Sequence, residues 1–251
     1  TPASGDKIVG KAHGAEDEKA LQFVRFTRLE RTMHISLIVS FITLALTGLT
    51  LKFSFTPWAR TLSKAFGGFE GAGFLHRAAA VLMFAIFVTH IVDVLRRKRR
   101  EGKTWRQMLT GPSTMLPTKK DGRDVVGTIK WFLGLGPRPQ YGRWTYWEKF
   151  DYFAVFWGVF MIGSTGLLLW FSELFTRLLP GWLINVATIV HSDEALLAVG
   201  FIFTIHFFNT HLRPEKFPMD IVVFTGRMSV EELKRDKPAE YEALVASGKL
   251  E

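Results

Sequence analysis

The chain has 251 residues, of which 48% are hydrophobic, and it carries a formal net charge of +9. It contains no cysteine, which excludes disulfides, cysteine-ligated iron–sulfur clusters, thiolate zinc sites and covalently attached haem within this chain. The basic residues are sorted by loop rather than gathered into one patch, so the positive charge does not predict binding to nucleic acid.

Four apolar stretches follow one another along the chain, each about as long as a membrane-spanning helix. They cover about residues 31–52, 73–95, 150–171 and 183–208. The predicted fold class is therefore all-α: an integral membrane four-helix bundle that forms a single domain over residues 1–251. A cytoplasmic amphipathic loop, 96–149, and a C-terminal helical tail, 209–251, complete it.

Lysine and arginine are distributed very unevenly among the connections. Six lie in 1–31, fourteen in 96–149 and seven in 209–251, whereas 52–73 has three and 171–182 has one. Because cytoplasmic loops carry the excess of basic residues, this asymmetry predicts that both termini and the long loop are cytoplasmic. A bacterial inner membrane is the expected location, and membrane lipids are expected partners.

The long loop and the tail each contain a predicted helix. In the loop, apolar residues at helical spacing predict an amphipathic helix at the membrane surface: Val125, Val126, Ile129, Phe132 and Leu133. In the tail, the spacing of Ser229 and Glu232 is that of a capping box, which predicts a short charged helix. We expect the tail to be a solvated appendage.

The glycines between 67 and 73 predict a flexible turn.

Two pairs of histidines lie inside the apolar stretches, His76 with His90 and His191 with His206. On an α-helix a separation of 14 or 15 residues returns to nearly the same face and advances roughly 21 to 22 Å. An imidazole in lipid loses its hydrogen bonds to water, so histidines within membrane spans usually act as ligands or proton carriers. Two imidazoles are a common axial ligand set for haem iron. The pattern therefore predicts two non-covalently bound haem b groups.

The direction of the spans assigns these histidines to two levels. His76 and His191 fall toward the outer face, and the outer haem iron is expected between them. The inner haem iron requires His206 together with either His34, at the start of the first span, or His90. A third haem would need both of these.

His211 follows His206 by five residues, which on an α-helix turns the side chain about 140° away. We therefore expect His211 not to face the same iron as His206.

Several of these residues stand in recognisable motifs, and together they resemble the γ subunit of membrane-bound formate dehydrogenases and the cytochrome b of nickel–iron hydrogenases. The resemblance covers roughly residues 25–213. It rests on Arg31-x-x-His34, Thr47-Gly48, His76, the aromatic stretch 141–150 and the paired histidines of the fourth span. Residues 146–150 and 206–218 resemble most a branch that accompanies periplasmic multihaem cytochromes c.

The resemblance implies further roles for individual residues. It implies that His34 and His206 ligate the inner haem, which leaves His90 spare. It also implies a site for menaquinone or ubiquinone beside the inner haem, with His34, Arg31, Asn209 and His211 as candidates.

The predicted haem sites and the resemblance together imply electron transfer across the membrane between a periplasmic redox partner and the quinone pool. The partner would be a multihaem cytochrome c or the iron–sulfur subunit of a dehydrogenase. The chain itself would be the quinone-reactive subunit of a membrane oxidoreductase complex. The alternative is a non-redox four-helix membrane anchor, in which the histidines serve only packing or hydrogen bonding.

Overall fold

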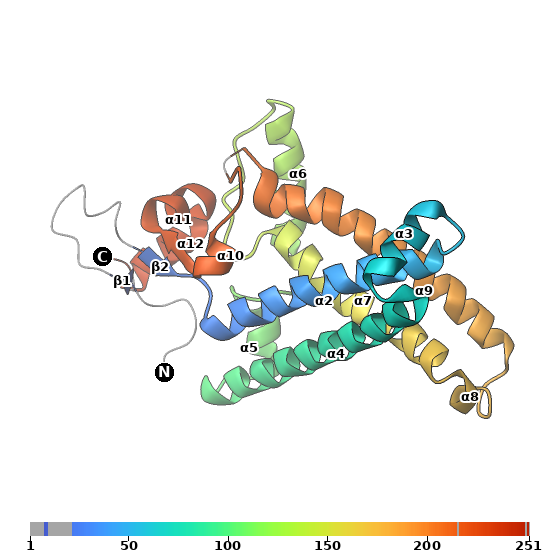
Figure 1. Ribbon diagram of the computed structural model, residues 1–251. Helices are drawn as coiled ribbons and strands as arrows, with labels where there is room; N and C mark the ends of the chain where they lie inside the picture. The colour runs from blue at the N-terminus through green and yellow to red at the C-terminus, as the bar shows by residue number, and fades with distance from the viewer. Residues whose placement is uncertain (1–7, 10–21, 215, 249, 251) are drawn as a thin grey trace. The chain divides into compact units, whose positions relative to one another are not determined.

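The computed structural model describes residues 8–9, 22–214, 216–248 and 250 (Figure 1). The chain divides into two compact units. Unit 1 combines the described residues of 1–31 with 93–153 and 220–251, and unit 2 combines residues 32–92 with 154–219.

Among the described residues, four helices are long and apolar enough to cross a membrane. Three are the α-helices α2 (Arg28–Lys52), α4 (Gly68–Arg100) and α7 (Tyr146–Trp170). The fourth runs from Trp182 to Leu212 and is built from α9 (Trp182–Phe201) and two π-helical segments, η1 (Ile202–His206) and η2 (Phe208–Leu212). The predicted all-α membrane bundle is confirmed, and each helix extends beyond its predicted bounds at one end or both.

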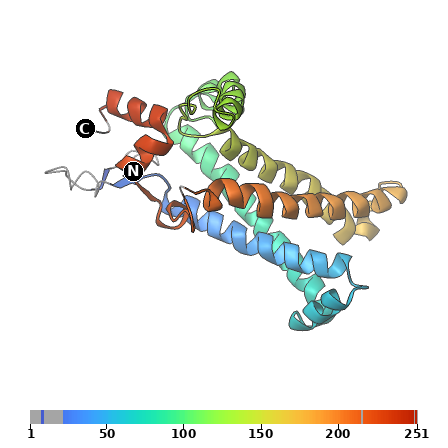
Figure 2. The same cartoon turned by 90° about the horizontal axis from the view of Figure 1, so that it is seen from above.

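Within unit 2 each of these helices contacts two others through its side chains. Figures 1 and 2 show the course of the four helices. The contacts are Ser40 Oγ to the Ala79 carbonyl at 2.8 Å, the rings of Phe87 and Phe156 at 5.0 Å, Trp157 Nε1 to Glu194 at 3.4 Å and Lys52 Nζ to Asp193 at 3.0 Å. They link α2 to α4, α4 to α7, α7 to α9 and α9 to α2. The helices therefore surround a common interior.

The outward side chains of these helices remain apolar and exposed. Val39, Val88, Phe160 and Ile189 are each more than half exposed, between 55% and 68%. In a soluble protein such surface would be a liability, but in a bilayer it contacts lipid chains at no cost.

Two short helices connect the spans in unit 2, α3 (Pro57–Ala65) and α8 (Ser172–Phe175). The turn after α3 is shorter than the glycine-rich sequence predicts. Only Gly67 and Gly68 take positive φ, at 80° and 89°, and α4 already begins at Gly68. The prediction of a flexible turn through residue 73 is therefore wrong.

Unit 1 contains a small antiparallel sheet, in the order β1 (Ile8–Val9), β2 (Gln22–Val24) and β3 (Arg227–Ser229). Three short helices of the tail accompany it: α10 (Val222–Thr225), α11 (Val230–Asp236) and α12 (Pro238–Ala246). The Ser229 hydroxyl accepts from the Glu232 N–H, as the predicted N-terminal cap of α11 requires. A core forms from both ends of the chain: Phe23, Val222, Met228, Val230, Leu233 and Leu250. The tail is thus a packed part of unit 1, and the prediction of a solvated appendage is wrong.

A buried ionic network holds this unit together. Arg25 is only 2% exposed, and it donates to Glu240 at 3.0 Å, to the Arg143 carbonyl at 2.8 Å and to Glu148 at 3.4 Å. Lys237 pairs with Glu148. Burial lowers the pKa of Lys237 to about 8, although the Glu148 carboxylate favours its charged form.

Two helices lie in the long loop of unit 1, α5 (Trp105–Thr110) and α6 (Lys119–Phe132). The predicted amphipathic helix is confirmed as α6, and it begins at Lys119, before the apolar residues that predicted it, because Thr118 and Asp121 form a capping box. Asp121 also accepts from Lys149 Nζ at 2.8 Å. Burial raises the pKa of Asp121, but the hydrogen bonds from Lys149 and Thr118 outweigh burial, and the net pKa lies below its usual value.

We expect Arg25→Met to loosen the tail, because it removes one of the two cations that pair with the buried Glu240 carboxylate and leaves Arg143 as the other. Removing one partner of a buried ion pair typically costs about 3 to 5 kcal/mol. The measurement is the rate of limited proteolysis within residues 222–248. The exposed Arg227→Gln is the matched control, and equal cleavage rates for both variants would contradict the role assigned to Arg25.

Candidate functional site

The interior of unit 2 brings His76 of α4 against His191 of α9. Their ring centroids are 6.1 Å apart and their planes differ by 72°. A metal ion held between two imidazole nitrogens, at about 2 Å from each, requires ring centroids roughly 6 Å apart. The spacing of the pair therefore matches one metal ion bound axially from both sides.

The hydrogen bonds of His191 decide which ring nitrogen is available. Its Nδ1 lies 2.9 Å from the carbonyl oxygen of Ile162, which can only accept, so Nδ1 carries the proton. The Thr165 hydroxyl, 3.4 Å from the same nitrogen, donates to the Met161 carbonyl at 2.6 Å and presents its lone pairs to the ring. The unprotonated nitrogen is then Nε2, the atom that binds metal.

His76 is arranged in the same way by α2. The Thr47 hydroxyl is 2.9 Å from Nδ1 of His76 and donates its own proton to the Thr43 carbonyl at 2.6 Å. The hydroxyl is therefore placed to accept from the Nδ1–H of His76, and the backbone of Leu44 offers His76 a second hydrogen bond. Both histidines of the pair have Nε2 as the free ligand atom.

A glycine lies against each of these rings. A Cβ added to Gly48 would meet Cε1 of His76 at 3.2 Å, and one added to Gly166 would meet Cε1 of His191 at 3.0 Å. Each glycine directly follows the threonine that contacts the same ring. The repeated sequence Thr-Gly-Leu, at 47–49 and 165–167, is the signal that could have revealed Thr165, which the sequence prediction missed.

The donor set fits iron porphyrin. In the part of the chain that the structure describes, no group of three or more His, Cys, Asp or Glu side chains could hold a metal ion by itself. A porphyrin supplies four of the ligand nitrogens, so the protein needs to provide only the two axial ones. His76 and His191 offer that pair.

At the other end of the fourth span the helix changes from α to π geometry. Backbone hydrogen bonds in a π-helix run from i to i+5, so the helix is wound more loosely than an α-helix, and His206 and His211 lie close together on it. Their ring centroids are 6.2 Å apart. The expectation that His211 points 140° away from His206 is wrong, since it assumed α-helical rotation.

His34 of α2 lies within electrostatic range of both His206 and His211. Its Nδ1 is buried and has no hydrogen-bond partner among the described residues. His90 instead packs edge-on against the ring of Phe156, at 5.9 Å. The structure thus groups His34 with His206 and His211, and places His90 against α7.

The remaining predicted residues have different surroundings. Asn209 is half-buried in η2, within the same π-helical segment as His211. Arg31 is part of unit 1, where its Nη1 donates to the Phe224 carbonyl at 2.7 Å. That bond ties Arg31 to the C-terminal tail.

A family model described as prokaryotic cytochrome b561 matches residues 6–111. The matched range contains His34, His76 and His90, and it ends before the third span. No match was found among curated proteins. The match covers 106 of the 251 residues, and it bears out the predicted resemblance to the membrane cytochromes b of hydrogenases and formate dehydrogenases.

Proposed function

We propose that the chain is a dihaem cytochrome b that carries electrons across the membrane between a periplasmic redox partner and the quinone pool. The observation that carries the proposal is the pair of His76 and His191, with ring centroids 6.1 Å apart and both Nε2 atoms free. Haem b bound there would supply one-electron redox chemistry without proton transfer at the iron. The partner we propose is a multihaem cytochrome c or the iron–sulfur subunit of a dehydrogenase.

A second haem would be held at the inner level by His34 and His206. The support is their proximity and the buried Nδ1 of His34, which requires a polar partner to offset its loss of hydration. His90 is the alternative ligand.

Residues at the end of the fourth span would serve menaquinone or ubiquinone. Quinone carbonyls need hydrogen-bond donors, and their reduction consumes protons from water. Asn209 and His211 occupy the last turns before the chain leaves the span, where an amide can donate and an imidazole can relay a proton. Arg31 and His34 complete the proposed candidate set.

The distribution of lysine and arginine supports a location in the bacterial inner membrane with both termini cytoplasmic. In this orientation the pair of His76 and His191 lies toward the periplasm, where an electron-transfer partner would dock. His34, His206 and Asn209 lie toward the cytoplasm, where protons for quinone would be taken up or released.

We expect the purified protein to contain two haem b groups, and His191→Ala to contain one. The measurement is a pyridine haemochrome assay of haem per chain. The same assay on His34→Ala and His90→Ala identifies the inner ligand, because only the ligand variant should lose a haem. A ratio of zero in the unmodified chain would rule out the electron-transfer function, and two haems remaining in both His76→Ala and His191→Ala would refute the ligand pair.

Thr47→Val should raise the midpoint potential of the outer haem and weaken its binding by about tenfold or more. The variant removes the acceptor for the Nδ1–H of His76, so the imidazole becomes less basic and stabilises ferric iron less. Redox titration followed by absorbance measures the shift. Thr43→Val is the control, because the Thr43 hydroxyl bonds only to the carbonyl of Val39 in its own helix. An unchanged potential in Thr47→Val would mean that the hydroxyl does not tune the ligand.

Asn209→Ala should slow electron exchange with quinone while leaving both haem spectra nearly unchanged. The amide is expected to contact the quinone and not the iron, so stopped-flow oxidation of the haems by a quinone analogue separates the two roles. Thr204→Ala on the same span is the control, since its hydroxyl bonds to the Gly200 carbonyl of its own helix. Loss of a haem in Asn209→Ala would contradict the assignment.

A further inference from the structure

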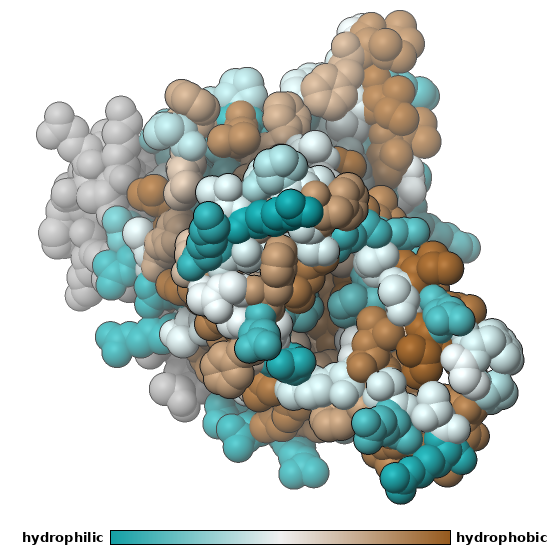
Figure 3. All heavy atoms as spheres, turned by 45° about the vertical axis from the view of Figure 1, so that its right-hand side comes forward, coloured by the Kyte–Doolittle hydropathy of each residue, from teal (hydrophilic) through white to brown (hydrophobic). Residues whose placement is uncertain are grey.

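Helix α6 presents an apolar surface that the rest of unit 1 does not cover. Val126, Ile129, Phe132 and Leu133 are between 52% and 74% exposed. At about 100° per residue, Val126, Ile129 and Leu133 fall within a sector of roughly 60° on the helix. The far end of α6, at the top of the view in Figure 3, is covered mainly by hydrophobic side chains.

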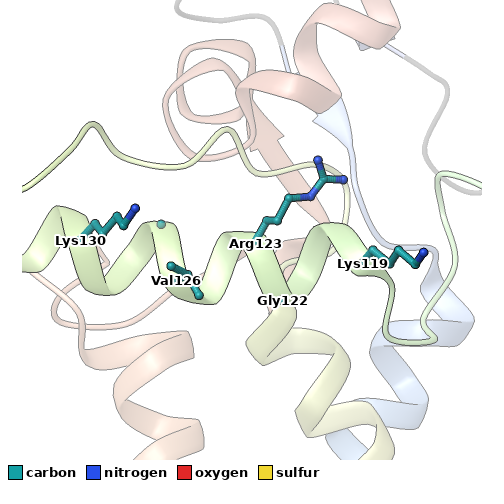
Figure 4. A pocket seen from close by; sticks show the side chains of 6 residues that line it. Lys119, Gly122, Arg123, Val126 and Lys130 are labelled. Atoms are coloured by element: carbon teal, nitrogen blue, oxygen red, sulfur yellow. The ribbon is translucent and has the colours of Figure 1, made fainter.

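A basic stripe runs beside this apolar surface. Lys119, Arg123 and Lys130 are exposed and fall within about 40° of one another around the helix. They border a shallow depression on α6 whose floor is formed by Gly122, Val126 and Gly127. Figure 4 shows the side chains of Lys119, Arg123, Val126 and Lys130 along the helix.

The opposite side of α6 is fastened to the segment that leads into a membrane span. Asp121 accepts from Lys149 in the first turn of α7, and the Thr128 hydroxyl lies 2.7 Å from the hydroxyl of Tyr141. A Cβ on Gly127 would meet Pro139 at 3.0 Å. Because α7 begins at Tyr146, these contacts hold α6 beside the first turn of a helix that is long and apolar enough to cross a membrane.

We propose that α6 lies in the headgroup region of the membrane and binds anionic phospholipids through Lys119, Arg123 and Lys130. The apolar sector enters the acyl boundary, while the adjacent cations pair with lipid phosphates. An interfacial helix requires this combination of an apolar face and a flanking row of cations. A nucleic acid would match the cations but would leave Val126, Ile129 and Leu133 in water.

The experiment uses the whole 251-residue chain in lipid nanodiscs with and without phosphatidylglycerol. Because the chain has no cysteine, Ile129→Cys carries a single spin label without background. Collision with oxygen reports lipid, and collision with an aqueous nickel complex reports water. Val245→Cys on α12, an exposed apolar position in the same unit, is the reference for a solvent-facing label.

The label at residue 129 should be immersed in lipid when phosphatidylglycerol is present. In nanodiscs that contain phosphatidylglycerol, the double variant Arg123→Gln with Lys130→Gln should shift the equilibrium of the label between lipid and water. The shift should be roughly 25-fold toward water, about fivefold for each cation removed. Arg227→Gln with Lys234→Gln, which removes the same charge elsewhere in unit 1, should leave the label in place.

Three results would overturn the proposal. The first is a label at residue 129 that reports water in every lipid composition. The second is immersion that is equal with and without anionic lipid and insensitive to the loss of Arg123 and Lys130, because α6 would then insert without recognising headgroups. The third is shielding from both reagents, which would mean that a second copy or another protein covers this face.

Discussion

The hydrogen bonds to Nδ1 of His76 and His191 determine what the interior of the spanning bundle can hold. An imidazole can present only one unprotonated nitrogen, and the acceptors on the neighbouring helices decide which one it is. Thr47 on α2 and Ile162 on α7 lie against the Nδ1 atoms, which leaves Nε2 of each ring as the nitrogen available to a metal. In a membrane the same bonds also satisfy a polar group that has no water nearby.

This arrangement requires the helices to approach each other closely. Gly48 and Gly166 lie where a Cβ would touch the imidazole rings, and their position directly after Thr47 and Thr165 means that one helical turn provides both the acceptor and the space. The two sides of the pair are built alike, by α2 against α4 and by α7 against α9. Each ring is therefore oriented by a helix other than its own.

The inner end of the bundle has a different helical geometry. There the fourth span gains an extra residue per turn, and the π-helical segments bring His206 and His211 to the same side, near His34. Such π-helical turns are costly and occur frequently at functional sites. Here the segment concentrates three imidazoles at one level. This group can supply a ligand and a proton carrier together, as the proposed exchange of electrons and protons with quinone would require.

The sequence by itself determined the class of protein and the positions of its spans, because the length of an apolar stretch and the charge of its flanks follow directly from the thickness and polarity of a bilayer. It also singled out His76 and His191, since their spacing from His90 and His206 matches whole helical turns.

Only the tertiary structure decided which nitrogen each ligand presents, because Thr47 and Ile162 come from other helices. The tertiary structure likewise decided that His211 turns toward His206, because the amino-acid composition of this segment does not distinguish a π-helix from an α-helix. It also decided that the tail is packed, because the cations and carboxylates that bury each other there, Arg25 with Glu240 and Lys237 with Glu148, lie far apart in the sequence.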